Sequence, residues 1–108
     1  MNFLSVDLED WHTSAYLRDY VTKKNYSSRI ESTTELILNS FDKHQVKATF
    51  FILGSIAKEH PQLIKRIAEN GHEIASHGYS HTPLWGLNPD SFQAEIQETN
   101  KILADLTG

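Results

Sequence analysis

The stretch Ala48-Thr49-Phe50-Phe51-Ile52-Leu53 is the part of the sequence that decides the fold. It is a short, unbroken apolar run, rich in aromatic and β-branched residues, and Gly54 ends it. Such residues favour strands. A run without polar alternation is typical of a strand that is buried on both faces of a parallel sheet. We therefore predict a buried parallel strand at this position.

A helix is predicted before this strand. Ser32 or Thr33 could cap its first turn, and Glu35 stands near the position that completes a capping box. The apolar stripe of this helix is formed by Leu36, Ile37 and Phe41. It is predicted to close over residues 43–45.

A second helix is predicted after the strand, with Pro61 in its first turn and Asn70-Gly71 at its end. One side of it is apolar and carries Leu63, Ile64, Ile67 and Ala68. A third helix is predicted to begin at Asn88-Pro89-Asp90. Its apolar face consists of Phe92, Ile96, Ile102, Leu103 and Leu106.

Two more strands are predicted, over residues 2–6 and 72–75, with a polar irregular stretch after the first one that reaches Ser28. Strands then alternate with helices along the chain. This order predicts an α/β fold, with about three parallel strands and three helices joined by right-handed crossovers. We find no internal repeat and expect residues 1–108 to form a single domain.

Composition narrows the classes of function. The formal net charge of −4 gives no electrostatic reason to expect nucleic acid or an anionic membrane as a partner. The chain has no cysteine, so a metal would have to be held by imidazole and carboxylate groups. No apolar run approaches the about 20 residues of a membrane span, and no signal-peptide pattern is present. We therefore expect a cytoplasmic location.

Two polar clusters follow predicted strands. Asp7, Glu9 and Asp10 come after the first strand, and His77 and His81 come after the third. Because the carboxyl ends of parallel strands meet at one edge of a sheet, these side chains could converge. Imidazole and carboxylate ligands suit Zn²⁺ and its neighbours, and a further carboxylate could act as general base. The clusters therefore predict metal-assisted hydrolysis of an amide or ester.

A simpler interpretation competes with this one. Acids that follow a strand often form only a solvated loop. The histidine pair has Gly78 and Ser80 between its members, so it is expected to begin in a loop, and helical spacing cannot be assumed. On the residues alone, the two interpretations stay balanced.

Four segments closely resemble the polysaccharide deacetylases of carbohydrate esterase family four: Lys47–Gly54, His60–Leu63, Asn70–His81 and the opening Ser5–Trp11. Most members have two adjacent aspartates in the opening motif, whereas this chain resembles a branch with an Asp-x-Glu-Asp arrangement. The resemblance implies a (β/α) barrel. It also implies a metal-dependent hydrolase that removes N-acetyl or O-acetyl groups from a polysaccharide or sugar precursor.

The resemblance also implies roles for single residues. Asp7 matches the catalytic base, and His77 and His81 match two histidine ligands of a divalent metal. The third ligand is Glu9 or Asp10, with a slight preference for Glu9. Zinc is the first expectation for the metal, with cobalt, nickel or manganese as alternatives.

Aromatic and histidine side chains near the motifs are candidates for substrate contacts. Trp11, His12 and Tyr79 are assigned to substrate binding, and Tyr16 and Trp85 could also stack on sugar rings, although all five could equally serve packing. His72 is expected to make a structural hydrogen bond at the start of a strand.

Relatives of this kind fold as a distorted barrel of about twice this length, and their later motifs carry a general acid that this chain lacks. We therefore expect a truncated, open half-barrel in which Phe50, Phe51 and Ile52 expose apolar surface at the edges. Such a chain should self-associate, bind metal weakly and turn over little or no substrate. Two other functions remain open: a catalytically incomplete assembly or binding subunit, and a hydrolase of a non-sugar amide.

Overall fold

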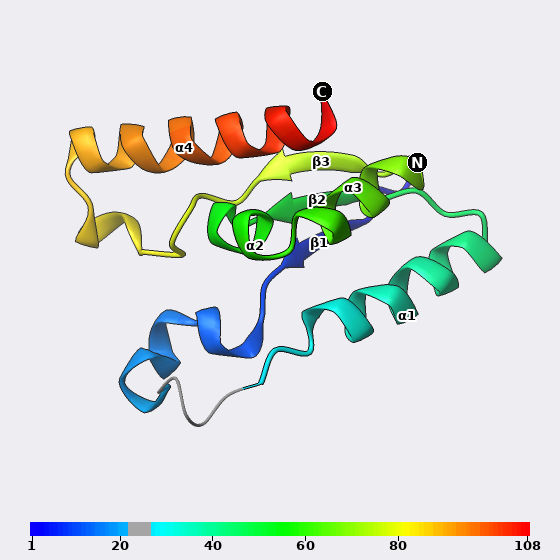
Figure 1. Ribbon diagram of the computed structural model, residues 1–108, viewed down its shortest axis with the longest axis horizontal. Coiled ribbons are helices and arrows are strands. Elements are labelled where there is room, and N and C mark those ends of the chain that lie inside the picture. Colours follow the sequence, from blue (N-terminus) through cyan, green and yellow to red (C-terminus); the bar gives the residue numbers. More distant parts are fainter. Residues whose placement is uncertain (22–26) are drawn as a thin grey trace.

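The computed structural model describes residues 1–21 and 27–108, and its strands form a single parallel sheet (Figure 1). The strands are β1 (Ser5–Leu8), β2 (Thr49–Ile52) and β3 (Glu73–Ser76). The α-helices are α1 (Ile30–Lys43), α2 (Gly54–Glu59), α3 (Pro61–Glu69) and α4 (Pro89–Thr107). The 3-10 helices are η1 (Trp11–Thr13), η2 (Ala15–Tyr20) and η3 (Leu84–Gly86).

The sheet confirms the predicted α/β class. Its strand order is β1-β2-β3, and both neighbouring pairs are parallel. The apolar run that predicted the fold forms the central strand, where Phe50 and Ile52 are fully buried. Leu8, Ile52 and Ser76 share one level across the three strands. The three strands therefore end side by side at one edge of the sheet.

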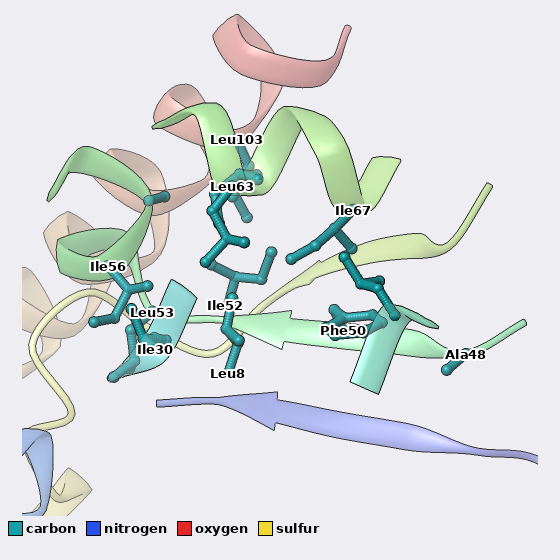
Figure 2. Close-up of a cluster of buried hydrophobic side chains, with 13 residues drawn as sticks. Leu8, Ile30, Ala48, Phe50, Ile52, Leu53, Ile56, Leu63, Ile67 and Leu103 are labelled. Atoms are coloured by element: carbon teal, nitrogen blue, oxygen red, sulfur yellow. The ribbon is translucent and has the colours of Figure 1, made fainter. Parts of the chain in front are cut away.

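Helices cover one face of this sheet and enclose the core (Figure 2). From the strands, Leu8, Phe50 and Ile52 point into the core, and helix residues such as Ile56 and Leu63 meet them there. Helix α4 packs across α2, α3 and β3. Each side chain of this kind contributes about 1.5–3 kcal/mol on full burial, so the core fixes the sheet and thereby the edge where the strands end.

The other face of the sheet carries a row of less buried side chains. Asp7 is exposed, and its neighbours across the sheet, Phe51 and Ala75, are half-buried. The predicted exposure of apolar surface at the edges was wrong for Phe50 and Ile52, because β2 is the central strand and both side chains face the core. Phe51 alone of these three lies on the open face.

Two predicted element starts were wrong. The first strand begins at Ser5 and runs to Leu8, so that Asp7 lies inside it. Helix α1 begins at Ile30, and the hydroxyls of Ser32 and Thr33 donate to the Arg29 carbonyl from within the first turns instead of capping. The strand thus lies further along the chain than predicted and the helix starts earlier, because Leu8 and Ile30 are both core residues.

The short helix α2 and the 3-10 helices were not predicted. Gly54 was interpreted only as the end of a strand, but it also opens α2. The polar stretch after the first strand forms η1 and η2, and residues 22–26 of it lie outside the described part of the chain. The remaining helix boundaries agree closely. Asn88 caps α4 by accepting from the Ser91 amide at 2.8 Å. Among the described residues, no helix is long and apolar enough to cross a membrane.

Candidate metal centre

Three side chains converge where β1 and β3 end. Glu9 follows β1 directly, His77 follows β3 directly, and His81 lies four residues further along. Glu9 Oε1 is 2.7 Å from His77 Nε2 and 3.2 Å from His81 Nε2. The two imidazole rings are 5.3 Å apart at their centres. Each of the three offers a ligand atom, and these atoms lie within 4.8 Å of one another.

The sheet places two of these side chains. Leu8 and Ser76 stand at the same level of the sheet, one on each side of Ile52, so the residues that follow them leave the sheet at the same edge. The His77 amide extends the ladder by donating to the Ile52 carbonyl at 3.0 Å. Glu9 and His77 are therefore positioned by the core, through the strands that carry them.

His81 is positioned by its loop. Gly78 and His81 both adopt left-handed backbone conformations, with φ values of 77° and 61°. For a residue with a Cβ this conformation costs about 1–2 kcal/mol. The ring of His81 offsets part of that cost, because its Nδ1–H donates to the Thr13 carbonyl at 3.0 Å. This bond leaves Nε2 facing Glu9.

The carboxylate of Glu95, on helix α4, forms hydrogen bonds with the same loop. It accepts from the Tyr79 amide at 2.7 Å, the Ser80 amide at 2.9 Å and the Ser80 hydroxyl at 2.5 Å. Burial opposes the ionisation of Glu95. The hydrogen bonds from Ser80 and Tyr79, with the charge of Arg18, outweigh burial and hold the pKa of this carboxyl below its usual range.

Backbone hydrogen bonds also join this loop to helix α2. The amides of Gly54 and Ser55, at the start of this helix, donate to the carbonyls of Gly78 and Tyr79 at 2.8 and 3.1 Å. A Cβ at Gly54 would lie 2.5 Å from side-chain atoms of both Tyr79 and Thr99. The close approach of loop and helix therefore requires glycine at this position.

Asp10, the alternative third ligand, lies in a different environment. Its side chain is buried, and Oδ1 accepts from the Trp11 amide at 2.9 Å, which caps η1. Its other oxygen is 3.6 Å from His12 Nδ1. The structure thus groups Glu9, and not Asp10, with the two histidines.

Asp7, assigned as the catalytic base, lies on β1 two residues before Glu9. Its carboxylate is exposed on the sheet face opposite to the core. Proton transfer requires such access, because the base must reach a water molecule in a substrate complex.

Of the three residues assigned to substrate binding, Trp11 and His12 lie side by side and Tyr79 lies apart. Trp11 is about half exposed, and its indole N–H donates to the Ser27 carbonyl at 3.3 Å. The ring of His12 packs edge-on against that indole. The ring of Tyr79 lies against Gly54, between α2 and α4, and Tyr79 lines neither of the two pockets that His81 lines. The structure therefore does not bring these three side chains together.

The converging donors fit a divalent metal ion. Two imidazole nitrogens and one carboxylate oxygen are one of the donor sets of three-ligand zinc sites, which keep one position open. All three side chains are partly exposed, so an ion and a substrate could reach them. Sequence reasoning missed Glu95, because an acid on an amphipathic helix carries no signal of the loop that it binds.

Comparisons with known proteins agree with this fold. The sequence model described as polysaccharide deacetylase matches residues 20–108. The peptidoglycan-N-acetylglucosamine deacetylase of Bacillus cereus is 45% identical over 75 residues, which are 69% of this chain and 27% of the relative. The chitooligosaccharide deacetylase of Rhizobium leguminosarum bv. trifolii is 40% identical over 70 residues, which are 65% of this chain and 33% of the relative.

A solved structure extends the likeness over the whole chain. It is a Mycobacterium smegmatis protein assigned to the polysaccharide deacetylases, with 27% identity and a TM-score of 0.80. The match covers 98% of this chain and 39% of that one. The chain spans about a third or less of the length of the two curated relatives.

Proposed function

The chain belongs to the polysaccharide deacetylase family, and on that premise we propose that it serves the metal-dependent removal of acetyl groups from a sugar polymer. The observation that carries this proposal is the convergence of Glu9, His77 and His81 at one edge of the sheet. The names of the relatives support an N-acetylated glycan as substrate, either peptidoglycan or a chitooligosaccharide.

In this proposal, Glu9, His77 and His81 hold the metal. The donor set favours zinc, and cobalt, nickel or manganese can take the same ligands. A divalent ion held by these residues would supply Lewis-acid chemistry: it would polarise the acyl oxygen and lower the pKa of a water molecule towards about 7. The Nδ1–H bond from His81 to the Thr13 carbonyl fixes the tautomer that presents Nε2 as a ligand.

Asp7 is the proposed general base. Its exposed carboxylate would accept the proton of the attacking water. A positioned base of this kind contributes a factor of about 10²–10⁴ to the rate. The general acid is not assigned to any residue of this chain. We accordingly expect slow turnover by the 108-residue protein alone.

Self-association belongs to the same proposal. The sheet face that carries Asp7, Phe51 and Ala75 has no fully buried side chain along the three strands. A second copy of the chain could pack against the apolar side chains of this face, Phe51 and Ala75, and leave Asp7 open to water.

The test is acetate release from an N-acetylated oligosaccharide. We expect the purified chain to release acetate slowly with Zn²⁺, to lose this activity when a chelator removes the ion, and to regain it when Zn²⁺ is restored. Asp7→Asn should lower the rate about 100-fold or more, since it removes the base but none of the three ligands.

Metal analysis of the same samples tests metal binding separately from catalysis. The Asp7→Asn protein should bind Zn²⁺ as the wild type does. Release that persists in the chelator would contradict metal dependence. A zinc-loaded wild type that releases no acetate from any N-acetylated glycan would favour the alternative of a catalytically incomplete binding subunit.

A further inference from the structure

A pocket lies beside the metal centre, between η2 and the segment that contains η3. It has a volume of about 580 Å³. Its lining includes Tyr16 and Arg18 of η2, His81 and Thr82 of the metal-centre loop, and Trp85 of η3. Because His81 belongs to both, a molecule in this pocket would touch the proposed metal centre.

Two aromatic side chains of this pocket are unusually exposed. Tyr16 is 88% exposed and Trp85 is 87% exposed. Aromatic side chains usually bury most of their surface on folding, because it is large and apolar. Two such rings at one pocket, on segments about seventy residues apart in the sequence, are more consistent with a binding surface than with packing inside the described chain.

Hydrogen bonds join the two walls of this pocket. Arg18 Nη2 donates to the Ser80 carbonyl at 2.8 Å and reaches the Thr82 hydroxyl at 3.5 Å. The hydroxyls of Ser80 and Thr82 are 2.6 Å apart. Turn hydrogen bonds fix η3, since the Gly86 amide donates to the Pro83 carbonyl at 2.8 Å. The pocket is therefore built before any ligand arrives, as is usual for ligand sites.

We propose that this pocket binds the sugar ring next to the one that loses its acetyl group, with Tyr16 and Trp85 as stacking surfaces. The inference rests on the proposed function. A pyranose ring has apolar C–H faces that stack on aromatic rings, and hydroxyl groups around its rim that need polar partners. The lining supplies both kinds of contact.

The polar groups favour a sugar over an apolar protein segment. Ser14, Arg18 and Thr82 line the pocket together with the aromatic rings. Arg18 and Thr82 use only part of their hydrogen-bonding capacity on the contacts between the walls, and an apolar segment would bury the rest unpaired, which costs free energy. Sugar hydroxyls can pair with them. The volume also falls within the range of about 300–1,000 Å³ that is usual for small-molecule sites.

The experiment measures binding of the trisaccharide of β-1,4-linked N-acetylglucosamine to the 108-residue chain by isothermal titration. Trp85→Ala and Tyr16→Ala should each weaken binding by about tenfold, the loss expected for one stacking contact. Phe3→Ala is the matched control, because Phe3 is 90% exposed but lines no part of this pocket. It should bind as the wild type does.

A metal-ligand variant separates this inference from the proposed function. His77→Ala should lose zinc binding and yet keep the tenfold effect of Trp85→Ala on trisaccharide binding. Zinc binding that survives in His77→Ala would contradict the metal centre, whereas the Trp85 effect would still support the sugar subsite. The subsite is refuted when the wild type does not bind the trisaccharide, or when Trp85→Ala and Tyr16→Ala bind it unchanged while their thermal unfolding matches the wild type.

Discussion

Two neighbouring acids, Glu9 and Asp10, have opposite environments in this fold. Glu9 is partly exposed and reaches both imidazole Nε2 atoms, whereas Asp10 is buried and caps η1. The side chain of Glu9 has one more methylene, and it leaves the strand on the side where His77 and His81 lie. A difference of one position along the chain thus separates a proposed ligand from a structural cap.

Glu95 should influence zinc binding through the loop that carries His81. Glu95→Ala should weaken zinc binding by about 10–100-fold, the range for residues that orient metal ligands, because the loop that carries His81 loses three hydrogen bonds. Competitive titration with a chromophoric chelator measures this affinity. Glu98→Ala, an exposed acid three residues later on α4, is the control and should bind zinc unchanged. Equal affinities for both variants would show that the loop holds its shape without Glu95.

His72 gives a prediction about pH. Its ring is buried between Phe41 and Phe50, and its Nδ1 accepts from the Ala48 amide at 3.2 Å. Burial, with a smaller contribution from the charge of Lys47, lowers the pKa of His72 from 6.5. As the pH falls below about 6.5, the unfolded chain therefore takes up a proton that the folded protein excludes, and the free energy of unfolding decreases.

His72→Asn tests this effect, because the amide oxygen can still accept a hydrogen bond but does not titrate. Urea unfolding between pH 7.5 and pH 5 should show a smaller loss of stability for the variant than for the wild type. The same pH dependence in both proteins would contradict a neutral, buried His72.

Single residues were predictable in part. His72 was expected to make a structural hydrogen bond, and the bond to Ala48 confirms that prediction. The sequence left Glu9 and Asp10 unresolved, because the choice depends on a 3-10 helix that was not predicted. The contact of Glu95 with Ser80 depends on how α4 packs across the sheet, and no local pattern encodes that.

At the scale of elements, α2 and the metal-centre loop form one unit through Gly54. Gly54→Ala would place a Cβ 2.5 Å from Thr99 and Tyr79 atoms, so one of these elements must move. We expect a loss of about 1–3 kcal/mol in the free energy of unfolding, the range for overpacking. Gly86→Ala is the control, since its Cβ would meet only the Thr82 methyl group at 3.2 Å. Chemical denaturation that shows equal stability for Gly54→Ala and the wild type would refute this contact.

The elements differ in how well the sequence predicts them. The central strand and helices α3 and α4 follow from long apolar patterns with clear ends at Pro61, Asn70-Gly71 and Asn88. Helix α2 has only six residues, and the glycine at its start was interpreted only as the end of a strand. A helix this short is held by its packing under α4 and not by local preference, so its residues alone could not reveal it.

At the scale of the whole molecule, the sheet has one covered and one open face. We predict that the chain associates in sedimentation experiments to species heavier than its own 12.3 kDa. Phe51→Ser should shift the equilibrium towards the monomer, because Phe51 is the large apolar side chain in the middle of the open face. Leu36→Ser, which changes an exposed apolar residue on α1, is the control and should have little effect. A wild type that stays at 12.3 kDa at all concentrations would contradict this prediction.

The central claim is that Glu9, His77 and His81 form a metal site, and zinc titration of four single variants tests it most directly. Glu9→Gln, His77→Ala and His81→Ala should each weaken zinc binding by about 100-fold or more, since each removes one of three ligands. Asp10→Asn should keep the wild-type affinity, because its side chain faces the η1 backbone. Wild-type zinc affinity in His77→Ala or His81→Ala, or a loss of affinity in Asp10→Asn that Glu9→Gln does not share, would contradict the account.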